Sequence, residues 1–328
     1  MSEQLTAAKK DFSRIGLSLF AIGAITAVLQ MVFSWLWAVS VYGTPLANTQ
    51  WVIWLITFAP LYLIAIPVGV LLMRPVPAEQ APSAKLGAKR FWALMLMCIP
   101  IMYAGNIIGT LLSMLLSGGT AENALLNYIN GSPLYTMLVV VLIAPALEEY
   151  IFRKQIIDRL GRYGERTAIL LSAVTFGLFH MNLFQFFYAF GLGLIFAYVY
   201  TRTQKLRYPV VMHMLINLNG SVIAPWIVNR VDMEAFQAIA AGEFDLAQLQ
   251  DLLPGLLVYM GYSGLLMIAV IAGAVLLIIQ WKKRQLLPAS QELPGGTAFK
   301  TAYLNLGMIL FAVFCLVMIA LSLFSGLL

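Results

Sequence analysis

The stretch Leu134–Arg153 reads LYTMLVVVLIAPALEEYIFR, and it joins an apolar run to a pair of acidic side chains. The part Leu134–Leu147 contains no charged residue and has the character of a helix inside a membrane. Glu148 and Glu149 follow it directly. Ionisable groups at such a position are costly, and they usually face the interior of a helical bundle. The stretch therefore predicts a membrane helix whose end carries functional carboxylates.

The composition of the whole chain also indicates a membrane protein. Apolar residues make up 61% of its 328 residues and charged residues only 10%, whereas soluble globular chains contain about a quarter charged residues. This composition excludes a soluble, disordered, fibrous or disulfide-rich secreted protein. Cys98 and Cys315 both lie in apolar runs, so no disulfide framework is expected. The net charge of +6 indicates basic cytoplasmic loops rather than a nucleic-acid partner.

About nine apolar segments are candidates for membrane crossings. They are Ile15–Val41, Trp51–Met73, Phe91–Leu116, Leu134–Leu147, Ala168–Leu183, Phe184–Tyr200, Pro209–Val228, Leu256–Trp281 and Thr301–Leu327. The fifth and sixth run together, so they are either two short helices or one broken helix. The predicted fold is an all-α polytopic membrane bundle of about eight to nine transmembrane helices, with a catalytic four-helix block at its centre.

The charges predict how these crossings are oriented. With a cytoplasmic N-terminus, this set of crossings places every Lys and Arg except Arg230 on the cytoplasmic side and an acidic loop, 229–255, outside. Such an asymmetry is what the positive-inside bias produces. We therefore expect a multi-pass protein in the lipid bilayer of a cell membrane, with a bacterial plasma membrane as the best match.

Two cytoplasmic linkers, 74–90 and 285–300, divide the chain. They predict an N-terminal two-span segment with its linker at 1–90, a catalytic membrane core at 91–228, and an acidic outer loop with a C-terminal two-span segment at 229–328. Within the core, Gly105-x-x-x-Gly109 is a pattern that allows close contact between helices.

The two acids are expected to have different roles. Glu149 and Arg153 are four residues apart with the acid first, the order that favours an ion pair, here at the end of the helix. Glu148 lies about 100° around the helix from Glu149, so it points elsewhere. Pro145 should bend the helix and loosen its hydrogen-bond ladder. Glu148 is thus the predicted base, with Glu149 and Arg153 as supporting residues.

The chain has only two histidines, and both lie in apolar segments of the predicted core. Phe176 and His180 share one helical face, and so do His213 and Asn217. With Glu148 they suit a hydrolytic centre, in which a carboxylate acts as general base on water and Asn217 donates to an oxyanion. Alternatively, Glu148, His180 and His213 form a His2Glu set of the kind that binds catalytic zinc.

Three motifs follow one another in the order Glu148-Glu149-x-x-x-Arg153, Phe176-x-x-x-His180 and His213-x-x-x-Asn217. Together they resemble the CPBP family of intramembrane proteases, also called Abi, which includes the type II CAAX prenyl endopeptidases and bacteriocin-processing and immunity proteins. The resemblance covers about 134–228.

The resemblance implies an intramembrane (metallo)endopeptidase that cleaves a membrane-associated peptide or protein near the cytoplasmic face. Glu148 would activate water with help from His180, and His213 and Asn217 would bind the oxyanion or a metal. Glu149 and Arg153 would hold the helix end. A prenylated substrate is not implied.

Two other classes of function stay open. A proton-coupled transporter also uses Glu and His side chains in the membrane, although no repeated halves are visible in the sequence. A bacteriocin-immunity or scaffold protein needs no catalysis and would tolerate loss of Glu148 or His213. Structural roles are also expected nearby: Asn182 most simply serves the turn after His180, and the aromatic residues of 184–190 pack or face lipid.

Overall fold

The computed structural model describes residues 2–44, 46, 49–79, 81–126, 131–241, 246–281 and 286–324, and every regular element among them is helical. The elements are α1 (Ser2–Val41), α2 (Gln50–Ala59), η2 (Pro60–Ala65), α3 (Ile66–Met73), α4 (Ala88–Ser117), α6 (Pro133–Tyr135), η3 (Thr136–Ile143), α7 (Ala144–Glu149), η4 (Tyr150–Gln155), α8 (Ile156–Leu160), η5 (Gly161–Tyr163), α9 (Glu165–Phe179), α10 (Leu183–Thr203), α11 (Arg207–Leu218), η6 (Asn219–Ile223), α12 (Ala224–Val228), α13 (Met233–Ala240), α14 (Leu246–Trp281), α15 (Ala298–Tyr303) and α16 (Leu306–Phe324).

Within the described residues, 8 helical segments are long and apolar enough to cross a membrane. They are Glu3–Val41, Gln50–Met73, Ala88–Ser117, Pro133–Tyr163, Leu183–Thr203, Arg207–Val228, Leu249–Gln280 and Leu306–Phe324. The remaining predicted crossing corresponds to α9, whose 15 residues are fewer than a bilayer normally requires. The prediction of an all-helical membrane bundle is confirmed.

The break between the fifth and sixth predicted segments separates two helices. Met181 adopts a left-handed conformation with a φ of 54°, and this ends α9. Asn182 then caps α10, because its Oδ1 accepts from the backbone N–H of Gln185 at 2.9 Å and its Nδ2 donates to the carbonyl of His180 at 2.7 Å. The predicted turn role of Asn182 is confirmed, and this turn fixes where His180 lies.

The fourth predicted span is longer than Leu134–Leu147, because the helix continues without interruption to Tyr163. Two π-helical stretches, η3 and η4, lie on either side of Pro145 and the acid pair. The charged residues after Leu147 remain inside the bundle because each finds a partner there. The ion pairs are Glu149 with Arg153, Lys154 with Asp158, and Arg162 with Asp11.

The π-helical turns account for the loosened hydrogen bonding expected at Pro145. In a π-helix the N–H of a residue bonds the carbonyl five positions earlier. Proline has no N–H, so the carbonyl of Val140 is left free. Asn217 of α11 fills this vacancy, donating from Nδ2 to the Val140 carbonyl at 2.9 Å. This hydrogen bond to a free backbone carbonyl thus fixes α11, the helix that carries His213, against η3.

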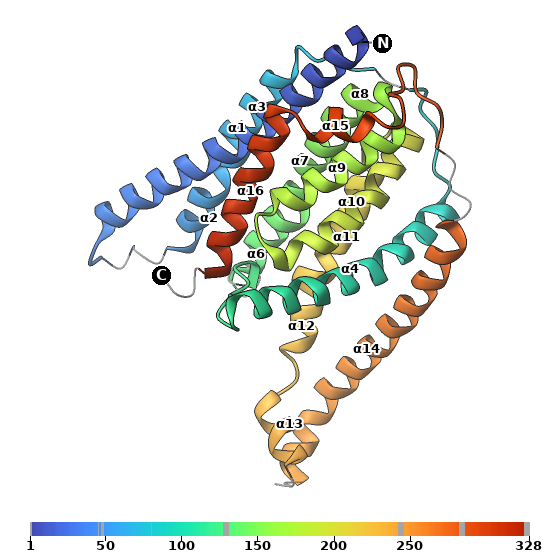
Figure 1. Cartoon of the computed structure of the whole chain (residues 1–328). Helices are drawn as coiled ribbons and strands as arrows, with labels where there is room; N and C mark the ends of the chain where they lie inside the picture. Colours follow the sequence, from blue (N-terminus) through green and yellow to red (C-terminus); the bar gives the residue numbers. More distant parts are fainter. Residues whose placement is uncertain are drawn as a thin grey trace.

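The largest apolar cluster crosses the borders of the three predicted segments. It joins Phe12 of α1, Phe152 of η4 and Met308 of α16, and it includes Leu293 from the loop before α15. Figure 1 shows α16 (red) beside α1 (blue), although they stand at opposite ends of the chain. The terminal helices and the core thus share one packed interior. The division into three segments stays a prediction from the sequence.

The predicted close contact at Gly105 and Gly109 is confirmed between α4 and α10. A Cβ added to Gly105 would lie 2.5 Å from the backbone of Tyr188, and one added to Gly109 would lie 2.3 Å from the carbonyl oxygen of Leu183. Only glycine permits this approach, which brings α4 against the start of α10.

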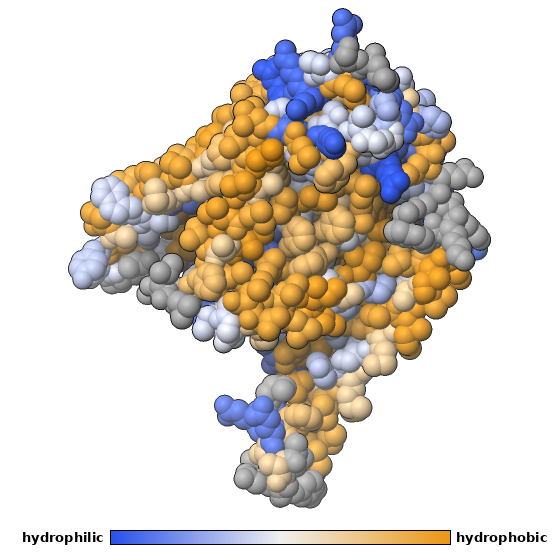
Figure 2. All heavy atoms as spheres, viewed as in Figure 1, coloured by the Kyte–Doolittle hydropathy of each residue, from blue (hydrophilic) through white to orange (hydrophobic). Residues whose placement is uncertain are grey.

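The hydrophilic residues gather at one end of the bundle. Figure 2 shows them at the top, above a broad hydrophobic band, with the hairpin around α13 projecting below. Hydrogen bonds join the segments at the top: Glu79 N–H to the Asp158 carbonyl, Ala84 N–H to the Thr203 carbonyl, and Gln291 N–H to the Arg162 carbonyl. We call this the basic end. Of the predicted acidic loop, Glu243 and Asp245 lie outside the described residues.

Candidate active site

Glu149 and Arg153 form a wholly buried ion pair. Arg153 Nε lies 2.8 Å from Glu149 Oε2, and both side chains are 0% exposed. Arg153 also donates to Ser172 Oγ of α9 at 3.0 Å, and its guanidinium carbon lies 4.5 Å from the centre of the Phe176 ring. The predicted pair is confirmed, but it lies in the middle of a continuous helix and not at a helix end.

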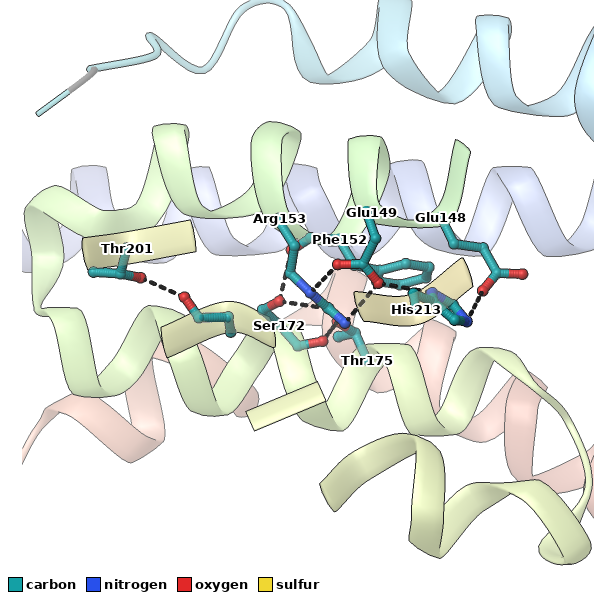
Figure 3. A network of polar contacts seen from close by, with 9 residues as sticks. Glu148, Glu149, Phe152, Arg153, Ser172, Thr175, Thr201 and His213 are labelled. Atoms are coloured by element: carbon teal, nitrogen blue, oxygen red, sulfur yellow. Dashed lines mark hydrogen bonds and ion pairs between the residues drawn. The ribbon is translucent and has the colours of Figure 1, made fainter. Parts of the chain in front are cut away.

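Glu149 has a second partner that the sequence did not predict. His213 Nδ1 lies 3.0 Å from Glu149 Oε1, at hydrogen-bond distance. Glu148 Oε2 lies 3.9 Å from Nε2 of the same ring. Figure 3 shows the two carboxylates reaching His213, with Arg153 and Ser172 on the side of Glu149 away from Glu148. A carboxylate accepts hydrogen bonds, so Nδ1 of His213 carries a proton and Nε2 is the nitrogen that faces Glu148.

His180 is held by the end of its own helix. Its Nδ1 lies 2.9 Å from the carbonyl of Phe176, so this nitrogen carries the proton and the neutral ring has its lone pair at Nε2. The Phe176 ring packs edge-on against both imidazoles, with centroid distances of 4.9 Å to His180 and 5.7 Å to His213. The shared helical face predicted for Phe176 and His180 is thus present, and Phe176 also serves as a spacer between the histidines.

The four residues predicted to be catalytic line a single cavity of about 520 Å³. Glu148 reaches it from α7, His180 from the end of α9, and His213 and Asn217 from α11. Glu148 keeps 21% of its side chain exposed, whereas Glu149 is sealed. Of the two acids, Glu148 is therefore the one that water or a substrate can touch.

Other cavity residues could not be found from local spacing. Tyr62 comes from η2, Tyr103 and Asn106 from α4, and Gln185 from the first turn of α10. The flanking N-terminal span therefore contributes to the cavity although it carries no motif. Phe196 of α10 also supports the site, because its ring centre lies 5.6 Å from that of His213.

This arrangement does not support the alternative zinc site. Within the described residues, no group of three or more His, Cys, Asp and Glu side chains is placed to hold a metal ion. Glu148 and His213 approach each other, but the Phe176 ring packs against both His213 and His180. The expected ligands Glu148, His180 and His213 do not fit a metal in these positions.

Fold and site together define a class: an all-helical membrane protein in which paired glutamates and two histidines meet at an internal cavity. The sequence profile described as "Type II CAAX prenyl endopeptidase Rce1-like" matches residues 130–219, which include every predicted site residue. This central segment therefore matches the Rce1-like, or CPBP, family that the three motifs resemble.

Two curated relatives agree with this family. The predicted membrane peptidase YdiL of Bacillus subtilis (strain 168) is 31% identical over 166 residues, covering 48% of this chain and 66% of the relative. The membrane-embedded CAAX protease MroQ of Staphylococcus aureus (strain USA300) is 37% identical over 105 residues, covering 30% of this chain and 41% of the relative. The chain thus spans just under two thirds of one relative's length and less than half of the other's. No solved structure matches.

Proposed function

We propose that the protein is an intramembrane endopeptidase that hydrolyses a peptide bond of a membrane-associated protein or peptide near the cytoplasmic face. The observation that carries this proposal is the cavity that Glu148, His180, His213 and Asn217 share. It supplies a carboxylate in contact with solvent, two imidazoles and an amide, which are the groups that general-base hydrolysis needs. The family and both named relatives, one a peptidase and one a CAAX protease, support the same reaction class.

In this mechanism His213 acts with a hydrogen on both ring nitrogens. Ionised Glu148 and Glu149 together carry one more unit of charge than Arg153 neutralises, and such a ring balances that excess. His213 then donates Nδ1–H to Glu149 and has Nε2–H free for an oxyanion in the cavity.

The reaction proceeds in two steps from this state. Glu148 takes a proton from a water molecule while the water oxygen attacks the substrate carbonyl carbon, and the oxyanion accepts from His213 Nε2–H and from the second amide hydrogen of Asn217. The lone pair of His180 Nε2 helps to orient the water. The tetrahedral intermediate then breaks its C–N bond, and Glu148 returns the proton to the leaving amine.

A comparison of cleaved N-termini tests the proposal without a known substrate. Membranes from cells that produce the wild-type protein, Glu148→Gln or the control Glu234→Gln are compared by mass spectrometry of labelled N-termini. Glu234 lies on α13, far along the chain from the cavity. We expect new N-termini in membrane proteins with wild type and control, and none with Glu148→Gln. Equal sets in all three would favour a scaffold, an immunity protein or a transporter.

A further inference from the structure

A second cavity of about 330 Å³ lies between α4, α9, α10 and α14. It shares no lining residue with the cavity around Glu148. Most of its wall is apolar: Ala93, Leu94, Met97, Ile169, Leu170, Leu194, Ile195, Leu277 and Leu286. We call it the lateral groove. In Figure 1 the start of α4 and the end of α14, which both contribute to it, meet at the right-hand edge of the molecule.

The polar residues of the lateral groove lie at one end of it. Arg90 belongs to the first turn of α4 and Arg166 to the first turn of α9. Tyr198 lies in the last two turns of α10, and Gln280 lies in the last turn of α14. The four helix ends named here lie at the basic end of the bundle. There, hydrogen bonds join Ala84 to Thr203 and Gln291 to Arg162. The apolar residues lie further along the helices, toward the centre of the membrane. The lateral groove is therefore polar at the membrane surface and apolar below it.

The two arginines of the lateral groove are not neutralised within the described part of the chain. Neither Arg90 nor Arg166 forms an ion pair there. The nearest acid in sequence, Glu165, is already used, because it pairs with Arg202 and accepts from the N–H of Leu287. Arg90 donates to the hydroxyl of Tyr198 at 3.3 Å, which holds its side chain over the groove. The mouth of the lateral groove thus presents two positive charges that no described acidic side chain pairs with.

We propose that the lateral groove binds one anionic phospholipid, with its phosphate between Arg90 and Arg166 and an acyl chain along the apolar wall. Guanidinium groups suit phosphate because they offer several donors in a fixed plane. The first turns of α4 and α9, which carry these arginines, also contain N–H groups without a partner inside their own helix. A soluble anion would use the arginines but not the apolar wall, whereas an apolar chain alone would leave the arginines unpaired. A phospholipid matches both parts.

A lipid in this position would contact α10, the helix that also packs on His213. Leu194, Ile195 and Tyr198 of α10 face the lateral groove, while Phe196 of the same helix packs on His213 in the catalytic cavity. The proposal concerns binding and does not depend on the proposed peptidase activity, so the two can fail separately.

Native mass spectrometry of the full chain tests the lateral groove. Wild-type protein in micelles with equal amounts of phosphatidylglycerol and phosphatidylcholine should retain one phosphatidylglycerol in preference. The variant Arg90→Gln/Arg166→Gln should lower that preference by about 25-fold, which corresponds to about 1 kcal/mol for each arginine near the surface. The matched control Lys10→Gln/Arg74→Gln removes the same charge from exposed positions outside the groove and should keep the preference.

A second variant separates the apolar wall from the charges. Ala93→Trp keeps every charge but fills part of the groove, so it should also reduce retention of phosphatidylglycerol. The single variants Arg90→Gln and Arg166→Gln keep the test informative if the double variant does not fold. The proposal is overturned if the double variant and the control lose preference equally, if Ala93→Trp retains the lipid, or if a copurifying peptide occupies the groove instead.

Discussion

Glu149 is the residue on which the alignment of the site depends. It binds Arg153 on one side and His213 on the other, and it is shielded from water. Glu148 is its neighbour in sequence but reaches the cavity. The two carboxylates therefore differ in accessibility and in partners, and only one is suited to take a proton from water.

Substitution of each acid should separate these roles. Glu148→Gln should lower turnover by about 10²-fold or more, as expected for a lost general base, and leave the protein folded. Glu149→Gln should instead destabilise the protein by about 3–5 kcal/mol, because Arg153 loses its buried partner. Cleavage per mole of folded protein and thermal unfolding measure the two effects. An active Glu148→Gln with an inactive Glu149→Gln would exchange the assignments.

A double substitution distinguishes support of the fold from positioning of His213. Arg153→Met in the Glu149→Gln background removes the unpaired guanidinium, so most of the lost stability should return. Activity should stay low, because His213 Nδ1 still lacks a carboxylate partner. Unfolding and cleavage are measured on the same samples. Recovery of both together would mean that Glu149 acts only through stability.

At the scale of elements, the π-helical turn before Pro145 links two helices of the site. The Val140 carbonyl that proline leaves free is bonded by Asn217, one turn after His213. The sequence predicted that Pro145 would loosen the helix and that Asn217 would lie on the face of His213. It did not predict the contact between them, since Asn217 and the Val140 carbonyl are 77 residues apart in sequence.

A double-mutant cycle tests this link. Asn217→Ala should cost about 1–3 kcal/mol, because the Val140 carbonyl is left without a donor. In a Pro145→Ala background the restored N–H can bond that carbonyl, so the same substitution should cost less. Activity should be reduced in both backgrounds, because the oxyanion donor is absent. Equal stability losses in the two backgrounds would show that Asn217 and Pro145 are not coupled.

Whether a contact of the site could be predicted depends on how far apart its two residues lie in the sequence. The Glu149–Arg153 pair and the Phe176–His180 contact lie within one helical turn, so helical periodicity alone finds them. The contact of Glu149 with His213 joins residues 64 apart and depends on how α11 packs against α7. The predicted span ended at Leu147, but the helix continues to Tyr163. The charges beyond Leu147 are buried in pairs, and hydropathy along the chain does not show such pairing.

At the scale of the whole molecule, the charges of the loops and the structure together predict at which end of the bundle each loop lies. The structure joins 79, 84, 158, 162, 203 and 291 at one end, and these positions belong to the segments that carry the basic residues. This arrangement requires α9 to return the chain across the bundle although it is short. From the positive-inside bias we predict that the basic end faces the cytoplasm.

Labelling of single introduced cysteines tests this topology in the full chain. Cys98 and Cys315 are buried, so they should react little with a membrane-impermeant maleimide. Ser83→Cys and Ser290→Cys are exposed at the basic end and should be labelled only after the cells are permeabilised. Glu122→Cys and Ala241→Cys are exposed near the other ends of α4 and α14, so they should be labelled in intact cells. The reverse pattern would place the basic end outside. Labelling of Ser83→Cys and Ser290→Cys from opposite sides would mean that α9 does not return the chain, because the number of crossings between them would then be odd.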